Sequence, residues 1–389
     1  MKVVLNSRGA ARLLARHLWV WENGVQLLPD TPGIYPVYGP RGLLGWGLVN
    51  PKSLIQVRIF HFGATDDPYT ALWANLERAL SFRRNLYEKE PAGGLRLVHA
   101  EGDLLPGLVI DSYARHLVVQ AHAAAWEPLL GELALRLESQ LSPAGILAKH
   151  DAPVRAREGL EQYQRTLAGR IPDGVVVREG EVRYRVGLHA GQKTGAFLDQ
   201  RENRLLLETY LEGRGFQRGL DVFSYQGLFA LHMARHIAEV EAVDSSAPAL
   251  QVARENAALN GLENLRFTEA NAFDLLRERQ RAWERYDVIV LDPPAFAARK
   301  ADRERALAAY KEVNLRALKL IAPGGLLVTS SCSHHVAEAD FYAMLTAAAA
   351  DAHRIVRLRE QRGQGADHPV LLTVPETRYL KLALLEVLA

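Results

Sequence analysis

The chain has 389 residues, 48% of them hydrophobic and 24% charged, and its formal net charge at pH 7 is +2. This length predicts two or three domains, and the composition is typical of a soluble globular protein of the cytoplasm. No apolar run approaches the roughly 18–20 residues of a membrane span. The N-terminus lacks the apolar core of a signal peptide, and the single cysteine excludes internal disulfides and zinc clusters rich in cysteine.

Residues 1–68 are predicted to form a small β-barrel, because turn residues separate short strand candidates at close intervals. The expected strands cover residues 33–38, 43–49 and 53–60. This segment holds seven Lys and Arg against four acidic residues, which gives it a formal charge of +3, more than the whole chain. It is therefore the part of the chain in which contacts with a nucleic acid are expected.

Residues 69–186 are predicted to form a middle α+β domain. Residues 69–87 and 126–141 have apolar side chains near the spacing of a helix. Between and after them lie strand candidates, at residues 95–99, 108–111, 116–120 and 145–149.

Residues 187–389 alternate between strand candidates and helical patterns. The strand candidates are residues 219–223, 239–243, 265–270, 287–291, 326–330, 354–359 and 379–387. This alternation predicts an α/β fold, a doubly wound, Rossmann-like domain of about seven strands with helices on both faces. Ligands bind such sheets outside the carboxyl ends of the strands, so the residues after each strand are the candidate site.

The first of these strands leads into Asp221-Val-Phe-Ser-Tyr-Gln-Gly227. This stretch has one glycine where a dinucleotide fingerprint needs three. An NAD-dependent dehydrogenase is therefore disfavoured, whereas a cofactor without phosphates, such as S-adenosylmethionine, is compatible. Taken alone, Gly227 is more typical of an ordinary turn than of a cofactor loop.

The next two strands end in Asp244 and Asn271. Asp244 lies about twenty residues past the first turn, where a carboxylate can accept hydrogen bonds from both hydroxyls of a ribose. Asp244 is also a candidate N-cap of the helix predicted at residues 248–259, a role compatible with the first because both lie at the same edge. The amide of Asn271 can both donate to and accept from the edge of an adenine.

The fourth and fifth strands end in groups suited to chemistry on a heterocycle. Asp292 is followed by Pro293 and a second proline, which form a rigid, extended exit. Cys332 lies between two serines and precedes two histidines, surroundings that lower a thiol pKa and leave it accessible. We therefore favour a nucleophile over a buried structural cysteine. The histidines lack further ligands at useful spacing, so no metal site is predicted.

Two motifs taken together carry a resemblance. Asp292-Pro-Pro294 with Ser331-Cys-Ser333 resembles the class I S-adenosylmethionine-dependent RNA 5-methylcytosine methyltransferases. The segments Gly191-Gln-Lys-Thr-Gly-Ala-Phe-Leu-Asp-Gln-Arg201 and Phe223-Ser-Tyr-Gln-Gly227 are similar to the RlmI-like branch, bacterial methyltransferases of large-subunit (23S) ribosomal RNA. His17-Leu-Trp-Val-Trp21 resembles that family's PUA domain, an RNA-binding barrel, and residues 100–111 resemble its middle domain.

The resemblance implies S-adenosylmethionine as cofactor and 23S ribosomal RNA as substrate. We expect Cys332 to add to carbon 6 of a cytosine, Asp292 to hydrogen-bond the N3 side of the ring, and the backbone of Pro293 to accept from its exocyclic amine. The loop at residues 192–200 is expected to close over the cofactor. The cofactor contacts that the resemblance implies are Lys193, Thr194, Phe197, Asp199, Phe223, Ser224, Tyr225, Gly227, Asp244, Asn271 and Asp292.

Two departures from the family and several alternatives stay open. Gln226 stands where the family usually has Thr, and Asn271 where it usually has an acid. A 5-methyluridine or base-amine RNA methyltransferase is an alternative chemistry, and a non-catalytic RNA-binding ribosome-assembly factor is an alternative from another class. The target nucleotide and the oligomeric state are not determined, and a homodimer is one option for the latter.

Overall fold

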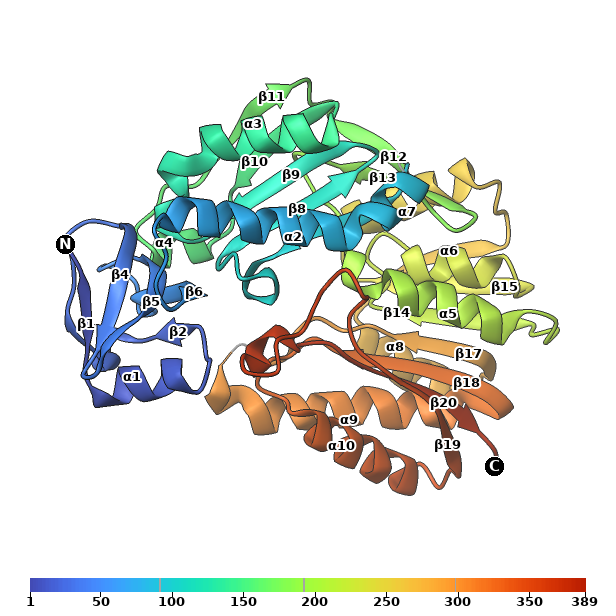
Figure 1. The fold of residues 1–389 in the computed structure, drawn as a ribbon. Coiled ribbons are helices and arrows are strands. Elements are labelled where there is room, and N and C mark those ends of the chain that lie inside the picture. Colours follow the sequence, from blue (N-terminus) through green and yellow to red (C-terminus); the bar gives the residue numbers. More distant parts are fainter. Residues whose placement is uncertain (91, 192, 298) are drawn as a thin grey trace. The chain divides into compact units, whose positions relative to one another are not determined.

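The computed structural model describes residues 1–90, 92–191, 193–297 and 299–389 (Figure 1). These residues form two compact units. The first unit comprises Met1–Arg178, Val186–Leu198 and Ala366–Thr377, and the second comprises Glu179–Arg185, Asp199–Gly365 and Arg378–Ala389. Within the described residues, no helix has both the length and the apolar character that a membrane crossing requires. The domain boundaries at residues 68 and 186 stay a prediction.

The first unit begins with a six-stranded sheet in the order β2-β6-β5-β4-β1-β3. The strands are β1 (Val3–Leu5), β2 (Trp19–Val20), β3 (Val25–Leu27), β4 (Gly33–Gly39), β5 (Gly42–Val49) and β6 (Val57–Phe62). The prediction for residues 53–60 is wrong in its first half, because residues 51–55 form a turn. In that turn the side chain of Asn50 accepts a hydrogen bond from the backbone N–H of residue 52, and that of Ser53 accepts one from the N–H of residue 55.

A helix that the sequence pattern did not indicate, α1 (Ser7–Leu14), packs beside this sheet. The side-chain oxygen of Asn6 caps it by accepting from the N–H of Gly9 at 3.0 Å. A Cβ at Gly9 would lie 2.2 Å from the carbonyl oxygen of Gly24. Only a residue without a side chain allows this close approach of helix and loop.

The same unit contains a five-stranded sheet in the order β11-β10-β9-β8-β7. Its elements are β7 (Gly94–His99), β8 (Leu108–Tyr113), β9 (His116–Ala121), β10 (Gly145–His150) and β11 (Tyr163–Gly169), with α2 (Pro68–Lys89), α3 (Leu130–Leu141) and α4 (Val154–Arg157). The helix predicted from residue 126 starts as a 3-10 turn, Ala124–Leu129, because Pro128 cannot donate an intrahelical hydrogen bond. Leucines of α2 and α3 form one apolar core with the strands. After this sheet, β12 (Gly174–Glu179) and β13 (Val182–Gly187) form a two-stranded sheet.

The second unit contains a seven-stranded sheet in the order β16-β15-β14-β17-β18-β20-β19. Its elements are α5 (Arg201–Leu211), β14 (Arg218–Val222), α6 (Leu228–Ala234), β15 (Glu239–Asp244), α7 (Ala247–Leu259), β16 (Leu265–Glu269), α8 (Ala272–Arg281), β17 (Tyr286–Leu291), α9 (Arg303–Leu320), β18 (Ile321–Ser331), α10 (Glu338–Asp351), β19 (Val356–Arg362) and β20 (Lys381–Val387). Strands β14 to β18 run parallel to their neighbours, whereas β20 is antiparallel to β18 and β19. The predicted doubly wound α/β fold with seven strands is thus confirmed.

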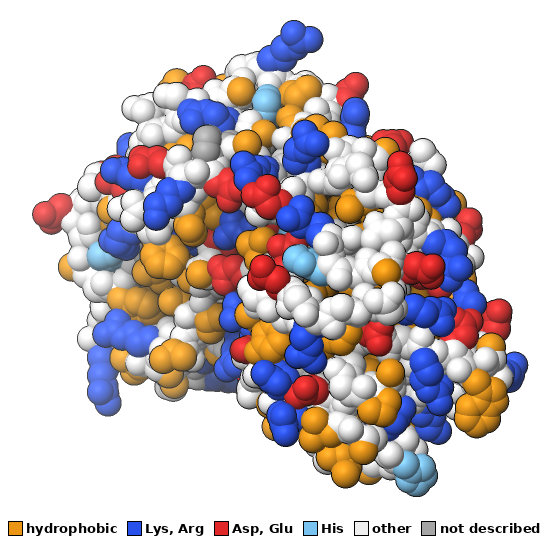
Figure 2. All heavy atoms as spheres, turned by 90° about the vertical axis from the view of Figure 1, so that its right-hand side faces the viewer, with side chains coloured by type: hydrophobic (Ala, Val, Ile, Leu, Met, Phe, Trp, Pro, Cys, Tyr) orange, Lys and Arg blue, Asp and Glu red, His pale blue; other side chains and the backbone are white. Residues whose placement is uncertain are grey.

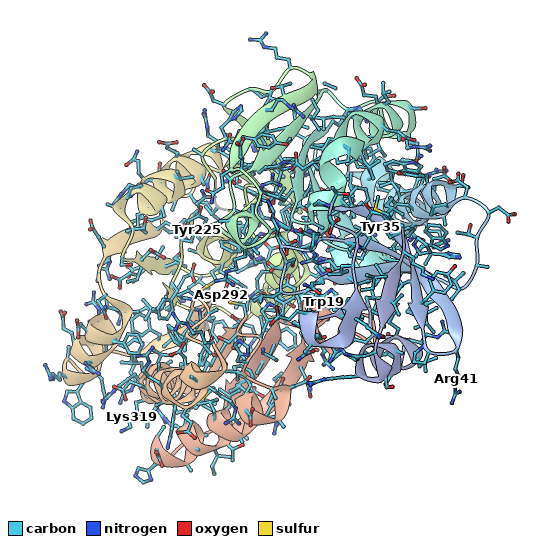
Figure 3. All side chains as sticks on the ribbon, turned by 90° about the vertical axis from the view of Figure 1, so that its left-hand side faces the viewer. Trp19, Tyr35, Arg41, Tyr225, Asp292 and Lys319 are labelled. Carbon is cyan, nitrogen blue, oxygen red and sulfur yellow. The ribbon has the colours of Figure 1, made fainter. Side chains whose placement is uncertain are left out.

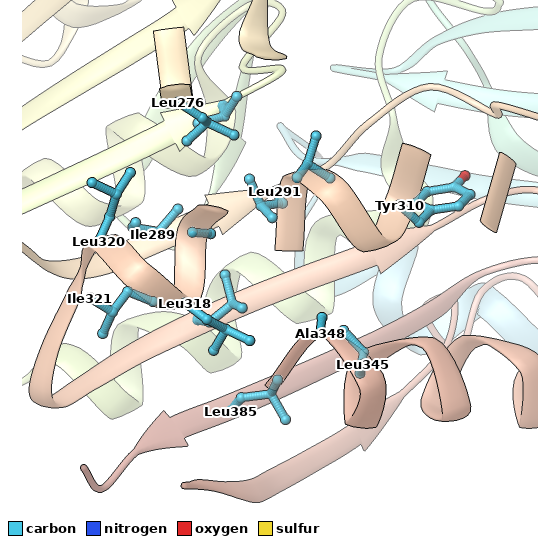
Figure 4. Packing of buried hydrophobic residues seen from close by; sticks show 14 of the residues in the cluster. Leu276, Ile289, Leu291, Tyr310, Leu318, Leu320, Ile321, Leu345, Ala348 and Leu385 are labelled. Carbon is cyan, nitrogen blue, oxygen red and sulfur yellow. The ribbon is translucent and has the colours of Figure 1, made fainter. Parts of the chain in front are cut away.

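Apolar side chains on both faces of this sheet explain why the strand sequences are hydrophobic without interruption. Val288 and Val290 of β17 pack with α5 and α6, while Ile289 and Leu291 pack with α8, α9 and α10. Figure 4 shows the second of these clusters between the strands and the helices. The buried centre leaves the ends of the strands as the places where polar residues can act.

Candidate active site

The carboxyl ends of the parallel strands bring together residues from five separate stretches of sequence. The N–H of Ser224 donates to the carbonyl of Val243 at 3.0 Å, and the N–H of Asp292 donates to the carbonyl of Val222 at 3.3 Å. We call the 223–227 loop, Asp244, Asn271, Asp292 and Cys332 the strand-end cluster; Figure 3 labels Tyr225 and Asp292 of it. Because β14 to β18 are parallel, the residues that end or follow these strands lie at the same edge of the sheet.

The 223–227 loop has an unusual backbone. Phe223, Tyr225 and Gly227 have φ angles of 65°, 49° and 79°. These angles lie in the left-handed region, which residues other than glycine rarely adopt. Asp221 holds this loop, because its carboxylate accepts from the hydroxyl of Ser224 at 2.5 Å and from the N–H of residue 230 at 3.0 Å. Strain of this kind is found where a loop must present its backbone to a ligand.

Asp221 is itself a residue that the sequence reasoning did not select. Burial raises its pKa to about 7, and its Oδ1 accepts no hydrogen bond from the described residues. The signal was present, since Asp221 opens the stretch that ends at Gly227. Its visible role is to shape the loop, and its second oxygen is available to an additional donor.

Asp244 is fixed at the end of β15. Its two oxygens accept from the backbone N–H groups of Tyr225 at 2.8 Å and of Ser246 at 2.9 Å. The prediction that Asp244 caps the following helix is wrong, because the N-cap is Ser246, whose hydroxyl accepts from the N–H of residue 249. A carboxylate has about four lone-pair positions, so Asp244 can still accept from the hydroxyls of a ribose.

Asn271 caps α8. Its side-chain oxygen accepts from the N–H groups of Phe273 at 2.9 Å and Asp274 at 3.3 Å. This oxygen therefore already serves the helix, and the NH2 group is the part of the amide that can face a ligand. Asn271 is suited to donate to a ring nitrogen of a base rather than to accept from an amino group.

Asp292 and Cys332 lie beside Pro293. The side-chain amide of Gln200 donates to Asp292 at 2.9 Å, and the hydroxyl of Ser330 donates to the same oxygen. Burial raises the pKa of Asp292 above its ordinary value. The Sγ of the half-buried Cys332 lies 3.9 Å from the carbonyl oxygen of Pro293. A thiol, a proline-held carbonyl and a carboxyl with a raised pKa thus share one end of the sheet.

The carboxyl ends of the strands are lined by further residues, which the sequence did not indicate. Phe296 lies with its ring centroid 6.1 Å from that of Phe223, 5.9 Å from that of Phe273 and 4.7 Å from that of Tyr310. The hydroxyl of Tyr310 is 2.9 Å from that of Ser333. Aromatic residues after β17 are a weak sequence signal, and the contacts of Gln200 join residues 92 positions apart, which no local pattern shows.

Three of the predicted cofactor contacts, Lys193, Thr194 and Phe197, belong to the first unit. The buried hydroxyl of Thr194 donates to Asp111 at 2.5 Å, and the Nζ of Lys193 lies 4.4 Å from the ring centroid of Phe197. Gln192, at the start of the loop expected to close over the cofactor, lies outside the described residues.

Asp199 is part of the second unit and accepts from the hydroxyl of Tyr379 at 2.7 Å. Contact of the cofactor with Asp199, and with the three residues of the first unit, stays a prediction.

Comparison with known proteins gives two domain matches. A methyltransferase-domain model matches residues 217–371, and a PUA-like-domain model matches residues 3–62. The chain is also similar, over 100% of its own length and 100% of theirs, to two solved structures with a TM-score of 0.84 and 18% identity. One bears the name of a SAM-dependent methyltransferase from Streptococcus mutans, and the other that of a methyltransferase complexed with SAH.

Curated relatives extend the likeness to the whole chain. The Ribosomal RNA large subunit methyltransferase I of Shewanella denitrificans is 37% identical over 376 residues, which are 94% of either chain. The protein of the same name from Pseudoalteromonas atlantica is 34% identical over 397 residues, covering 100% of this chain and 99% of that one.

Fold, strand-end cluster and matches together define an enzyme, an S-adenosylmethionine-dependent methyltransferase with a PUA-like domain at its N-terminus. The alternative of a non-catalytic assembly factor is therefore wrong. Among methyltransferases, the chain belongs to the family of Ribosomal RNA large subunit methyltransferase I.

Proposed function

We propose that this enzyme methylates carbon 5 of a cytosine in large-subunit (23S) ribosomal RNA, with Cys332 as the nucleophile that adds to carbon 6. The names of the relatives support the RNA substrate. The observation that carries the chemistry is the Sγ of Cys332 beside the carbonyl of Pro293, directly after Asp292. The target base must be unpaired or flipped out, because stacking hides carbon 6.

The thiolate of Cys332 donates an electron pair to carbon 6, which forms a carbon–sulfur bond and makes carbon 5 electron-rich. S-adenosylmethionine, when bound, supplies the methyl group that carbon 5 takes up, and S-adenosylhomocysteine leaves. Loss of the carbon 5 proton to a base or a water molecule then returns an electron pair, the carbon–sulfur bond breaks, and Cys332 leaves as the thiolate.

Asp292 is suited to donate a hydrogen bond to N3 of the cytosine. Because burial raises its pKa, Asp292 keeps its proton to a higher pH than an ordinary carboxyl, and a protonated carboxyl donates a hydrogen bond to a ring nitrogen. The carbonyl of Pro293 accepts from the exocyclic amine. This carbonyl faces the thiol of Cys332, so it loses that donor when the thiolate forms and becomes available to the base.

The cofactor is proposed to lie across the 223–227 loop, Asp244 and Asn271. The residues present fit such a ligand, since Asp244 has lone pairs left for a ribose and the capping bonds of Asn271 use only its oxygen, which leaves its NH2 group for a base. Asp199 and, from the first unit, Lys193, Thr194 and Phe197 complete the proposed contacts. Gln226, where the family usually has Thr, lies in this loop and is buried.

The N-terminal PUA-like domain is the proposed RNA contact. The guanidinium of Arg12 lies 4.1 Å from the ring centroid of Trp21, and that of Arg16 lies 4.7 Å from the ring centroid of Phe62. Arginines stacked on aromatic rings suit both phosphates and unpaired bases. By contrast, Figure 2 shows basic and acidic side chains intermixed over the face that it draws, which gives no field of one sign.

The central test is Cys332→Ala. This variant should transfer no methyl group from labelled S-adenosylmethionine to 23S ribosomal RNA of a gene-deleted strain, yet bind S-adenosylhomocysteine with unchanged affinity. His335→Ala, an exposed change in the same loop, is the matched control and should keep full activity.

Mass spectrometry of the modified nucleoside completes the test. The wild-type enzyme should produce 5-methylcytidine. Full activity of Cys332→Ala would contradict covalent catalysis, and 5-methyluridine or an amine-methylated base in the product would contradict the assignment to cytosine.

A further inference from the structure

Lys381 is a buried cation that reaches the segment carrying Cys332. It is the first residue of β20 and pairs with Ser331, the last residue of β18. The side chain is 5% exposed. Its Nζ donates to the carbonyl oxygens of Ser333 at 2.7 Å and Val336 at 3.0 Å. Both carbonyls belong to residues 332–337, which we call the Cys332 loop.

Two neutral carbonyls do not neutralise a buried ammonium, and such a group is costly to keep without a counter-charge. Among the residues that the structure describes, no carboxylate lies within ion-pair distance of Lys381. Burial lowers the pKa of Lys381 to about 8, and the strongest charge interaction that opposes this fall is with Cys332. At pH 7 the lysine is therefore still largely protonated. Among the surrounding anions, a Cys332 thiolate interacts most strongly with this positive charge.

We propose that Lys381 is the positioning residue of the Cys332 loop: its ammonium holds the loop by two carbonyls and stabilises the thiolate of Cys332. The role of the thiolate as nucleophile is that of the proposed function, on which this inference rests.

The other charged groups around this loop do not replace Lys381. Glu338, on α10, and Arg378 form an ion pair of 2.7 Å with each other. His334 and His335 are exposed to solvent, so water and salt screen any charge that they carry.

One further titratable group that interacts with the thiol is Tyr310, from α9, and another, Asp292, lies at the end of the neighbouring strand β17. When ionised, either would oppose a thiolate. Burial raises the pKa of both groups, which keeps Tyr310 neutral and favours the neutral form of Asp292. Within the described surroundings of Cys332, Lys381 is thus the buried cation that no carboxylate balances.

The single cysteine of the chain makes the test direct, because iodoacetamide can then alkylate only Cys332 among the thiols. The rate of alkylation is measured against pH on the full-length protein without RNA. In the wild type we expect the midpoint at least about one unit below the ordinary thiol pKa of about 8.5. In Lys381→Met and Lys381→Gln the midpoint should rise by about one unit or more, which makes alkylation at pH 6.5 about tenfold slower.

Lys381→Arg keeps the positive charge and should keep the low midpoint, while methyl transfer should fall in both neutral variants. Lys319→Met is the control. Lys319 lies in the last turn of α9, just before the start of β18, whereas the Cys332 loop follows the other end of β18. Its loss should leave the midpoint unchanged.

An unchanged midpoint in folded Lys381→Met or Lys381→Gln would overturn the proposal. If neither neutral variant folds, the wild-type profile decides, and a midpoint at or above about 8.5 contradicts a stabilised thiolate. Because alkylation needs neither RNA nor cofactor, this result is independent of the proposed function: an active Cys332→Ala enzyme would refute the nucleophile, not the effect of Lys381 on the thiol.

Discussion

A group of buried charged side chains in the second unit is held together by direct contacts. Glu179, Arg204 and His232 are each at most 2% exposed and lie in direct contact. The carboxylate of Glu179 accepts from the guanidinium of Arg204 at 2.6 and 2.8 Å and lies 3.0 Å from the Nε2 of His232. Such contacts keep the pKa of Glu179 low, at about 2, despite its burial. Each charge in this group therefore depends on the others being present.

Replacing Arg204 by Met should lower the free energy of unfolding by about 3–5 kcal/mol, because the buried carboxylate of Glu179 loses its main counter-charge. Urea unfolding followed by circular dichroism measures this loss. The control is Arg305→Ala, which breaks an exposed pair with Asp302 and should cost about 0–1 kcal/mol. Equal losses in the two variants would contradict the dependence on burial.

At the scale of the element, the 223–227 loop shows how one glycine sets the backbone of a site. A Cβ at Gly227 would meet the Cβ of Ala253 at 3.0 Å, whereas a Cβ at Gly213, with a similar φ of 70°, meets nothing within 4 Å. The two glycines share the left-handed conformation but differ in their neighbours. They therefore separate conformational strain from crowding.

Gly213→Ala should cost about 1–2 kcal/mol of unfolding free energy through strain alone and should leave the affinity for S-adenosylhomocysteine unchanged. Gly227→Ala should cost more, because the helix α7 must also move, and should weaken that affinity at least about tenfold. Titration calorimetry and urea unfolding measure both effects. Unchanged cofactor affinity in Gly227→Ala would remove the 223–227 loop from the cofactor site.

At the scale of the whole molecule, buried histidines make the stability of the first unit depend on pH. The first unit contains His122 and His150, whose pKa values burial lowers to about 4. His150 is completely buried, and its ring packs edge to face on Tyr163 with centroids 4.9 Å apart. A histidine with a depressed pKa in the folded state stabilises the fold above its unfolded pKa of about 6.5. This stabilisation is lost as the pH falls from about 6.5 through 4.

Unfolding of the wild-type protein should therefore require less urea at pH 5 than at pH 7. His150→Leu removes a group that must gain a proton on unfolding, so the difference between the two pH values should shrink in this variant. Exposed His335 is the site of the control change, His335→Ala, which should leave the difference as in the wild type. A pH dependence that is the same in all three proteins would show that His150 is not its source.

The fold of the second unit was predictable from the sequence because its signals are local. Residues 288–291 are apolar without interruption, which is what a strand covered on both faces requires. The parallel arrangement then places Asp292 at the same edge as Asp244 and Asn271, whatever the details of packing. The helix α1 was missed because it has only eight residues, and its buried face of Gly9, Ala10 and Leu13 is too short to stand out as a helical repeat.

The sequence by itself determined the parallel strands of the second unit, the edge at which the polar groups gather, and the resemblance that names Cys332 and Asp292. These follow from periodicity and from chain order, which are local properties. Only the tertiary structure decided which groups support them. Lys381 reaches the Cys332 loop because the last strand inserts antiparallel beside β18, and Gln200 reaches Asp292 across 92 positions. The partners of a buried charge are set by long-range pairing of strands and helices, which no window of sequence contains.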